Sequence, residues 1–165
     1  MREVVIKDAW DQMFERAEDD PLLFGTRKIA VDISTLHPDP AQIFRLWQLY
    51  LENVDPLLKV THTPSLQGRI IEAAGNILNI SQPLEALMFS IYCMSIQSLD
   101  EAESMAIFGA SKADLLTRYY FGCQQALLNC GFLRSGDRDR LTALFLYLVS
   151  LLGCFQTYSN NIRFR

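Results

Sequence analysis

The sequence has few of the residues from which catalytic and metal sites are built. It contains two histidines and four cysteines in 165 residues, no Gly-rich phosphate-binding loop and no G-x-S-x-G motif. His37 and His62 each lie in a proline-flanked connector without a spaced metal-binding partner, so we interpret both as loop histidines that hydrogen-bond to backbone. These absences predict that the chain is not an enzyme and that it has no cofactor or metal ion of its own.

Short paired cysteine spacings, which are typical of zinc sites, are also missing. The N-terminal segment Met1–Trp10 carries four charged residues and lacks the apolar run of a secretory signal, which predicts an intracellular chain without disulfides. We therefore interpret the cysteines as small buried apolar residues. They are Cys93, Cys123, Cys130 and Cys154.

Buried carboxylates and a basic surface are not indicated either. The acidic groups Glu15–Asp20 and Asp100–Glu103 lie in segments predicted to be exposed, whereas acid–base catalysis needs a carboxylate whose pKa is raised by burial. The formal net charge is −4 and the isoelectric point is near 5.1. The only basic cluster is interrupted by two aspartates and reads Arg134, Asp137, Arg138, Asp139 and Arg140. The composition thus predicts no direct contact with nucleic acid.

What the sequence does have is helical apolar spacing, and no segment alternates in the manner of a β-strand. It predicts an all-α fold, a stack of about five helices over residues 37–155. A partly disordered leader, residues 1–36, with a short amphipathic helix at Ile6–Ala17, would precede this domain, and a tail, residues 156–165, would follow it. The five predicted helices begin near Asp39, Thr63, Ser81, Ser111 and Asp137. In the first of these, Phe44, Trp47 and Tyr50 recur at helical spacing and are interpreted as core.

Two predicted helices contain long stretches without charge, residues 86–99 and 141–162. The first should be buried nearly all round. The second includes Leu141–Phe155, which falls short of the roughly 18 to 20 apolar residues that cross a bilayer, so we predict a buried helix and no membrane contact. The short polar tail cannot cover it, which predicts packing against other protein domains or a second chain. The predicted packing residues are Leu141, Leu144, Phe145, Leu148, Leu152 and Phe155.

Several ordered motifs resemble the fungal-specific transcription factor domain, the middle regulatory region of zinc-cluster regulators. The likeness covers roughly residues 20–152 and lies in four segments: Leu36–Leu57, Lys59–Leu66, Leu84–Tyr92 and Gln124–Leu133. The resemblance implies an α-helical regulatory domain of a nuclear, DNA-binding regulator, in which a separate cluster of six cysteines binds zinc and reads DNA. That cluster is absent from this sequence, so zinc and DNA contact are assigned to no residue here.

The resemblance also implies further helices beyond Leu152, whereas the sequence turns polar and ends at Arg165. We therefore expect an incomplete domain, the N-terminal half of a larger helical fold. Two other functions remain open at this stage. One is a stand-alone helical adaptor that binds a partner through the apolar face of its last helix, and the other is a small helical enzyme. A metal or substrate requirement that depended on His62 would favour the enzyme.

Overall fold

The computed structural model describes residues 32–133 and 136–163, with side chains described as far as Gly153. The chain divides into two compact units, Met1–Ala30 and Val31–Arg165, and every described residue belongs to the second. The predicted helix Ile6–Ala17 and most of the predicted leader lie outside the described residues. At the end of the predicted leader, Ser34–Leu36 form a 3-10 helix, η2, and Ile33 is buried.

The described residues form helices joined by short connectors, with no strand among them, which confirms the predicted all-α class. The five predicted helices are all present, and the last continues through most of the predicted tail. Two helices were not predicted, α3 and α6. The α-helices are α2 Pro40–Asn53, α3 Asp55–Leu58, α4 Thr63–Gly75, α5 Gln82–Gln97, α6 Glu101–Phe108, α7 Lys112–Asn129 and α8 Arg138–Arg163, and η3 at Ile77–Asn79 is a further 3-10 turn.

Side chains at the helix starts explain most of these boundaries. The Asp39 carboxylate accepts a hydrogen bond from the Gln42 amide at 3.0 Å, and the Ser111 hydroxyl accepts one from the Asp114 amide at 3.1 Å. Helix α6 begins with a capping box, in which Asp100 and Glu103 bond to each other's backbone amides. The exposed acidic segment is therefore a helix start as well as a solvated surface.

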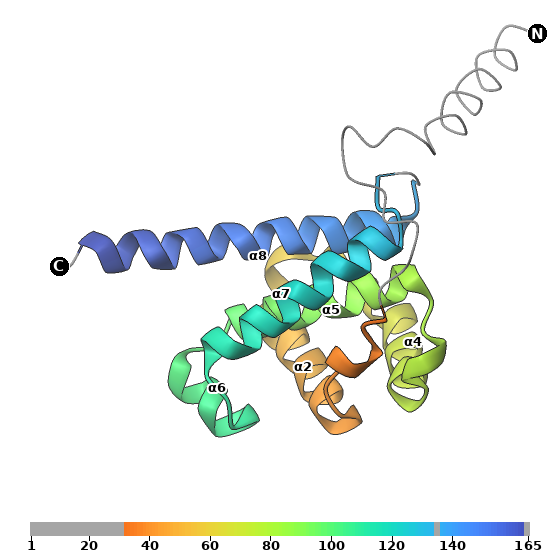
Figure 1. Cartoon of the computed structure of the whole chain (residues 1–165), viewed down its shortest axis with the longest axis horizontal. Coiled ribbons are helices and arrows are strands. Elements are labelled where there is room, and N and C mark those ends of the chain that lie inside the picture. The colour runs from red at the N-terminus through yellow and green to blue at the C-terminus, as the bar shows by residue number, and fades with distance from the viewer. Residues whose placement is uncertain (1–31, 134–135, 164–165) are drawn as a thin grey trace, which may run out of the picture. The chain divides into compact units, whose positions relative to one another are not determined.

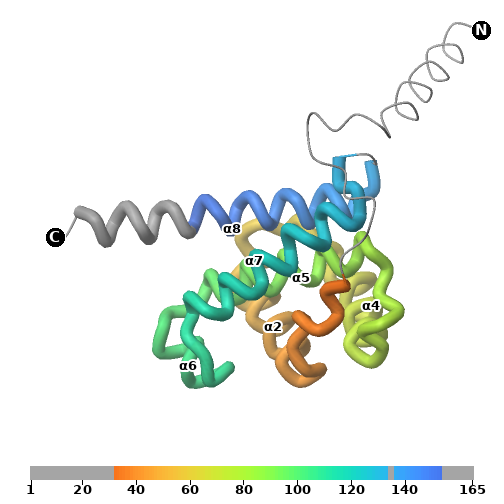
Figure 2. The backbone as a smooth tube through the Cα atoms, in the orientation of Figure 1, coloured from red at the N-terminus to blue at the C-terminus, as the bar shows by residue number. Residues whose placement is uncertain are grey.

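The end of α7 is a Schellman motif built on a glycine. Gly131 has a φ of 60°, which a glycine adopts without a Cβ clash. The Phe132 amide donates to the Leu127 carbonyl at 3.3 Å and the Gly131 amide donates to the Leu128 carbonyl at 3.2 Å. This stop turns the chain, so that α7 and α8 run back along one another (Figure 2).

Helix α5 is the centre of this unit. It packs mainly against α7, α8 and α2, which surround it (Figure 1). Every residue from Ala86 to Ile96 is buried, which confirms the prediction for this charge-free stretch. Its buried hydroxyl groups are satisfied: Ser90 donates to the Leu87 carbonyl at 2.8 Å, and Ser95 donates to the Leu46 carbonyl of α2 at 2.8 Å. The fold is thus organised around one apolar helix.

The first predicted helix shows one error in its core assignment. Trp47 and Tyr50 are buried in α2 and their rings stack with centroids 5.6 Å apart. Phe44 is 38% exposed, so the prediction that it belongs to the core is wrong. Ile43 and Leu46 take its place because they flank the side of α2 that faces α5, whereas Phe44 points about a third of a turn away.

Candidate functional site: the outward face of helix α8

Helix α8 has one side that is fully integrated into the core. Ala143 and Leu146 are each 0% exposed, and Ser150 is 1% exposed. The polar groups on this side bond to α7: the Gln124 amide donates to the Tyr147 hydroxyl at 2.7 Å, and the Tyr120 hydroxyl donates to the Ser150 carbonyl at 3.0 Å. Helix α8 is therefore held firmly against α5 and α7 by packing and hydrogen bonds.

The opposite side of α8 is apolar and exposed. Leu141 is 53% exposed, Phe145 44%, Leu148 50% and Leu152 65%. Their spacing of four, three and four residues places them in one stripe, which we call the outward face of α8. Leu144 is half-buried beside the stripe, and the side chain of Phe155 lies outside the described residues. An ordered row of four large apolar side chains in water is typical of a protein interaction surface.

The adjacent helix α7 carries further exposed apolar side chains. Phe121 is 51% exposed and Leu128 44% exposed, and the two are seven residues apart, so they share one face of α7. Exposed leucines elsewhere, such as Leu57 and Leu78, stand alone on short helical turns. Large exposed apolar residues in a regular row are thus a feature of α7 and α8.

The structure places His37 differently from the sequence-based prediction. His37 is buried, and its Nδ1 lies 3.2 Å from the Tyr92 hydroxyl. Its ring centroid is 4.4 Å from that of Phe89. Nε2 lies 3.4 Å from a Glu85 carboxylate oxygen, an ion-pair distance, but without the geometry of a hydrogen bond. The prediction of a loop histidine bonded to backbone is wrong here, because the connector is laid across α5 and the ring meets side chains instead.

His62 is an exposed residue at the N-cap position of α4. Its Nδ1 lies 2.9 Å from the Ser65 hydroxyl, so its partner is also a side chain rather than the predicted backbone group. No second histidine, cysteine or carboxylate group joins it in a cluster of metal-ligating type, and no such cluster of three occurs anywhere in the described part of the chain. The two histidines are not brought together by the fold, since His37 meets α5 and His62 begins α4.

Three of the four cysteines have the predicted environment. Cys93 and Cys123 are each 0% exposed, and Cys130 is 4% exposed. Burial raises the pKa of the Cys130 thiol, which lowers its fraction of reactive thiolate at neutral pH. Cys154 lies beyond the described side chains. The interpretation of these thiols as small core residues is confirmed for the three that are described.

The described helices include none with the length and hydropathy of a bilayer-spanning segment.

Comparisons with known proteins agree on one class of relative. The chain is 57% identical over 151 residues to the transcriptional regulator AacuB of Aspergillus aculeatus, an alignment that covers 92% of this chain and 21% of the relative. It is 50% identical over 151 residues to the transcriptional regulator nsrM of Aspergillus novofumigatus, and this alignment covers 88% of this chain and 21% of the relative. The C6 finger domain transcription factor adaR of Aspergillus niger is 32% identical to it over 120 residues, and this alignment covers 72% of this chain and 15% of the relative.

The chain is homologous to one segment of fungal transcription factors. It spans about a fifth of the length of the curated relatives it matches. No family model matches the sequence, so the narrower resemblance to the fungal-specific transcription factor domain stays a prediction. No solved structure is similar to the chain.

Sequence reasoning missed the polar contacts between distant segments, and two of them illustrate why. One is the His37 contact with α5, and the other is the ion pair of Arg69 in α4 with Asp139 in α8. Neither has a local sequence signal, because the partners are separated by 55 and 70 residues respectively. Only the tertiary arrangement of the helices reveals them.

Proposed function

We propose that this chain is a non-catalytic regulatory segment of the kind found in the middle region of fungal zinc-cluster transcription factors. Its relatives include proteins named as transcriptional regulators and C6 finger transcription factors, which supports a role in transcription and a nuclear location. In this proposal, zinc and DNA are bound by a separate six-cysteine cluster and not by the chain described here. The chain itself acts through helix packing.

The observation that carries the proposal is the contrast between the two sides of α8. One side is buried against α5 and α7, while the outward face presents Leu141, Phe145, Leu148 and Leu152 to water. Fully burying a leucine or phenylalanine side chain contributes roughly 1.5–3 kcal/mol relative to leaving it exposed. Covering four side chains that are each about half exposed would contribute on the order of 4 kcal/mol before the entropic cost of docking.

The proposed occupant of this face is an amphipathic helical segment of the same class of regulator. The relatives carry about four-fifths of their length outside the region that matches this chain, which supplies candidate segments. No charged side chain occurs from residue 141 to 162, so the occupant should present an apolar face with few charges at its centre. A helix that packs along the outward face would contact side chains of α8 that are one helical turn apart.

A capture experiment tests this proposal. The full chain, carrying an affinity tag, is co-expressed with the parts of AacuB that lie outside the matched segment. We expect these parts to co-purify with the chain, and Leu148→Glu to reduce the recovered amount about ten-fold or more, because a carboxylate would be buried without a partner.

The matched control is Leu78→Glu, which places the same charge on an isolated, 82% exposed leucine of η3. It should leave the recovered amount unchanged. Circular dichroism of both variants should show unchanged helix content, since both positions face solvent. Equal recovery with Leu148→Glu and with the unmodified chain would refute the docking role of the outward face.

A further inference from the structure

Hydrogen bonds mark the line along which the antiparallel helices α7 and α8 meet (Figure 2). The Gln124 amide of α7 donates to the Tyr147 hydroxyl of α8 at 2.7 Å, and the Tyr120 hydroxyl donates to the Ser150 carbonyl at 3.0 Å. The rings of Tyr120 and Tyr147 have centroids 6.0 Å apart. We call the line marked by these four residues the α7–α8 seam.

Large apolar side chains of α7 stand beside this seam. Phe121 lies three residues before Gln124 and Leu128 lies four residues after it, so the three share one side of α7. Phe121 and Leu128 are both exposed. No charged residue occurs from residue 120 to 128 of this helix. The α7 side of the seam is therefore an uncharged apolar edge.

The α8 side of the seam is apolar as well. Leu144 lies three residues before Tyr147 and Leu151 four residues after it, so both lie on the seam side of α8, where they are half-buried. Leu148 of the outward face lies between them in sequence, four residues from one and three from the other. Because the helices are antiparallel, Phe121 lies near the level of Leu151, and Leu128 near the level of Leu144. An apolar pair, one side chain from each helix, thus borders the seam on either side of its central hydrogen bonds.

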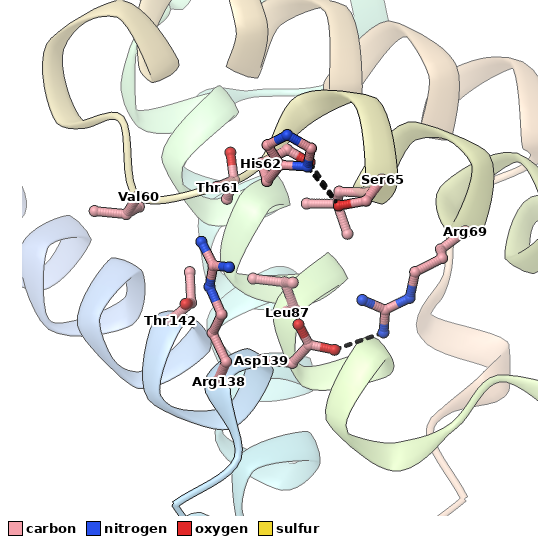
Figure 3. Close-up of a pocket in the computed structure, with 10 residues that line it drawn as sticks. Val60, Thr61, His62, Ser65, Arg69, Leu87, Arg138, Asp139 and Thr142 are labelled. Carbon is pink, nitrogen blue, oxygen red and sulfur yellow. Dashed lines mark hydrogen bonds and ion pairs between the residues drawn. The ribbon is translucent and has the colours of Figure 1, made fainter.

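The opposite flank of α8 is polar. Thr142 lies about 140° around the helix from Tyr147, and together with Arg138 and Asp139 it lines a small open pocket that α4 completes (Figure 3). Within this pocket, Asp139 accepts a hydrogen bond from the Arg69 guanidinium. An apolar occupant that leaned toward this flank would remove charged groups from water, which is unfavourable. The flank next to α7 therefore suits an apolar occupant better.

We propose that the partner helix packs over the α7–α8 seam, with Phe121 as its anchor on α7, and not on α8 alone. This inference rests on the proposed function, which supplies the occupant, and it adds a second helix to the docking surface. The apolar side chains that border the seam are seven residues apart on each helix, which is about 10 Å. One amphipathic helix of about three turns, with apolar residues at i, i+3 or i+4, and i+7, covers this length. The Gln124 amide is already bonded to Tyr147, which lowers the cost of covering the centre of the seam.

Charge substitution in the same capture experiment tests the role of α7. The tagged full chain is co-expressed with the parts of AacuB that lie outside the matched segment, and Phe121→Glu should reduce their recovery about ten-fold or more, as Leu148→Glu does. The matched control is Phe44→Glu, the same substitution at a 38% exposed phenylalanine of α2, a helix that does not border the seam. It should leave the recovery unchanged. Circular dichroism should show the same helix content for both variants, since both side chains reach solvent.

Photo-crosslinking locates the partner without introducing a charge. Phe121→benzoylphenylalanine and Leu148→benzoylphenylalanine should both crosslink, on irradiation of the captured complex, to one stretch of about 12 residues of AacuB, because a single helix would lie over both positions. Phe44→benzoylphenylalanine should crosslink to none of it. Mass spectrometry of the crosslinked peptides identifies the stretch and its apolar spacing.

The outcomes separate this inference from the proposed function. Reduced recovery with Leu148→Glu but full recovery with Phe121→Glu would overturn the seam and leave the docking role of α8 intact. Full recovery with both variants would refute the proposed function, and the seam with it. Crosslinks from position 121 to a second copy of this chain, or to a different stretch from the one reached from position 148, would overturn the single partner helix.

Discussion

Helices α5 and α8 are alike in sequence and different in surroundings. Both contain a long stretch without charge, residues 86–99 in α5 and 141–162 in α8. Helix α5 has α2, α7 and α8 around it, and eleven consecutive residues from Ala86 to Ile96 are buried. Helix α8 is covered on one side, and its outward face is exposed. An apolar helix indicates a need for neighbours, but the sequence alone does not say where those neighbours are.

The largest expected difference between the two helices is in how much stability is lost when a phenylalanine is replaced by alanine. Phe89 of α5 is 0% exposed and touches the rings of His37 and Tyr92, whereas Phe145 of α8 is 44% exposed. We expect Phe89→Ala to lower the free energy of unfolding by about 3–5 kcal/mol, because it leaves a cavity in a packed core. Phe145→Ala should lower it by less than about 1 kcal/mol.

Urea denaturation followed by circular dichroism measures both changes, at a protein concentration where the chain is monomeric. Comparable losses in the two variants would mean that the outward face is packed within this chain, and the contrast between α5 and α8 would then disappear.

A second difference should appear at alkaline pH. Burial, the main cause, raises the pKa of Tyr119, which contacts Tyr92 of α5, from 10.0 to about 12. The folded state therefore holds this proton when the unfolded state has lost it. The resulting stabilisation is complete below pH 10 and is lost as the pH rises through about 12, on the order of 2 kcal/mol.

Burial also raises the pKa of Tyr147 on α8, but this residue is more exposed than Tyr119. Tyr119→Phe should therefore remove more of the alkaline loss of stability than Tyr147→Phe. The urea concentration at the midpoint of unfolding, measured between pH 9 and pH 11.5, compares the stability of the two variants. An equal or larger effect of Tyr147→Phe would show that the tyrosine responsible for the alkaline loss of stability lies on α8 and not beside the α5 core.

A third, smaller effect concerns the contact of α7 with α5. A Cβ on Gly122 would lie 2.5 Å from the Phe89 ring, which is buried and has no room to move. Gly122→Ala should therefore destabilise the chain by about 1–2 kcal/mol, after allowing for the better helix propensity of alanine.

The control is Gly68→Ala in α4, where an added Cβ meets nothing within 4 Å. This variant should stabilise the chain by up to about 1 kcal/mol. Thermal unfolding of the pair distinguishes close packing from propensity, because the two substitutions are chemically identical. Stabilisation by Gly122→Ala would contradict the tight contact between α5 and α7.

Local signals in the sequence account for much of the fold. Asp39 and Ser111 start helices as predicted, and Gly131 ends α7, because capping depends on residues a few positions apart. Helix α6 could have been predicted in the same way, since Asp100 and Glu103 form the D-x-x-E pattern of a capping box. Their acidity alone indicated only an exposed surface.

The candidate site was less accessible to prediction. Apolar spacing predicted the packing residues of α8 as a set, but it could not say which side of the helix meets α5, since residues without charge occupy both sides. Ala143 and Ser150 are buried, whereas Leu141 and Leu152 are exposed, although the reverse order is expected from hydrophobicity alone. The buried side combines these small residues with Leu146 and Tyr147, so the position of a residue relative to the neighbouring helices, and not its hydrophobicity, decides its burial.

The most direct test of the outward face is multi-angle light scattering of the full chain over a range of concentrations, with an apolar dye as a second readout. The account predicts association that increases with concentration and dye binding by the unmodified chain, both reduced by Leu148→Glu and unchanged by Leu78→Glu. A monomer at all concentrations that melts cooperatively and binds no dye would contradict it.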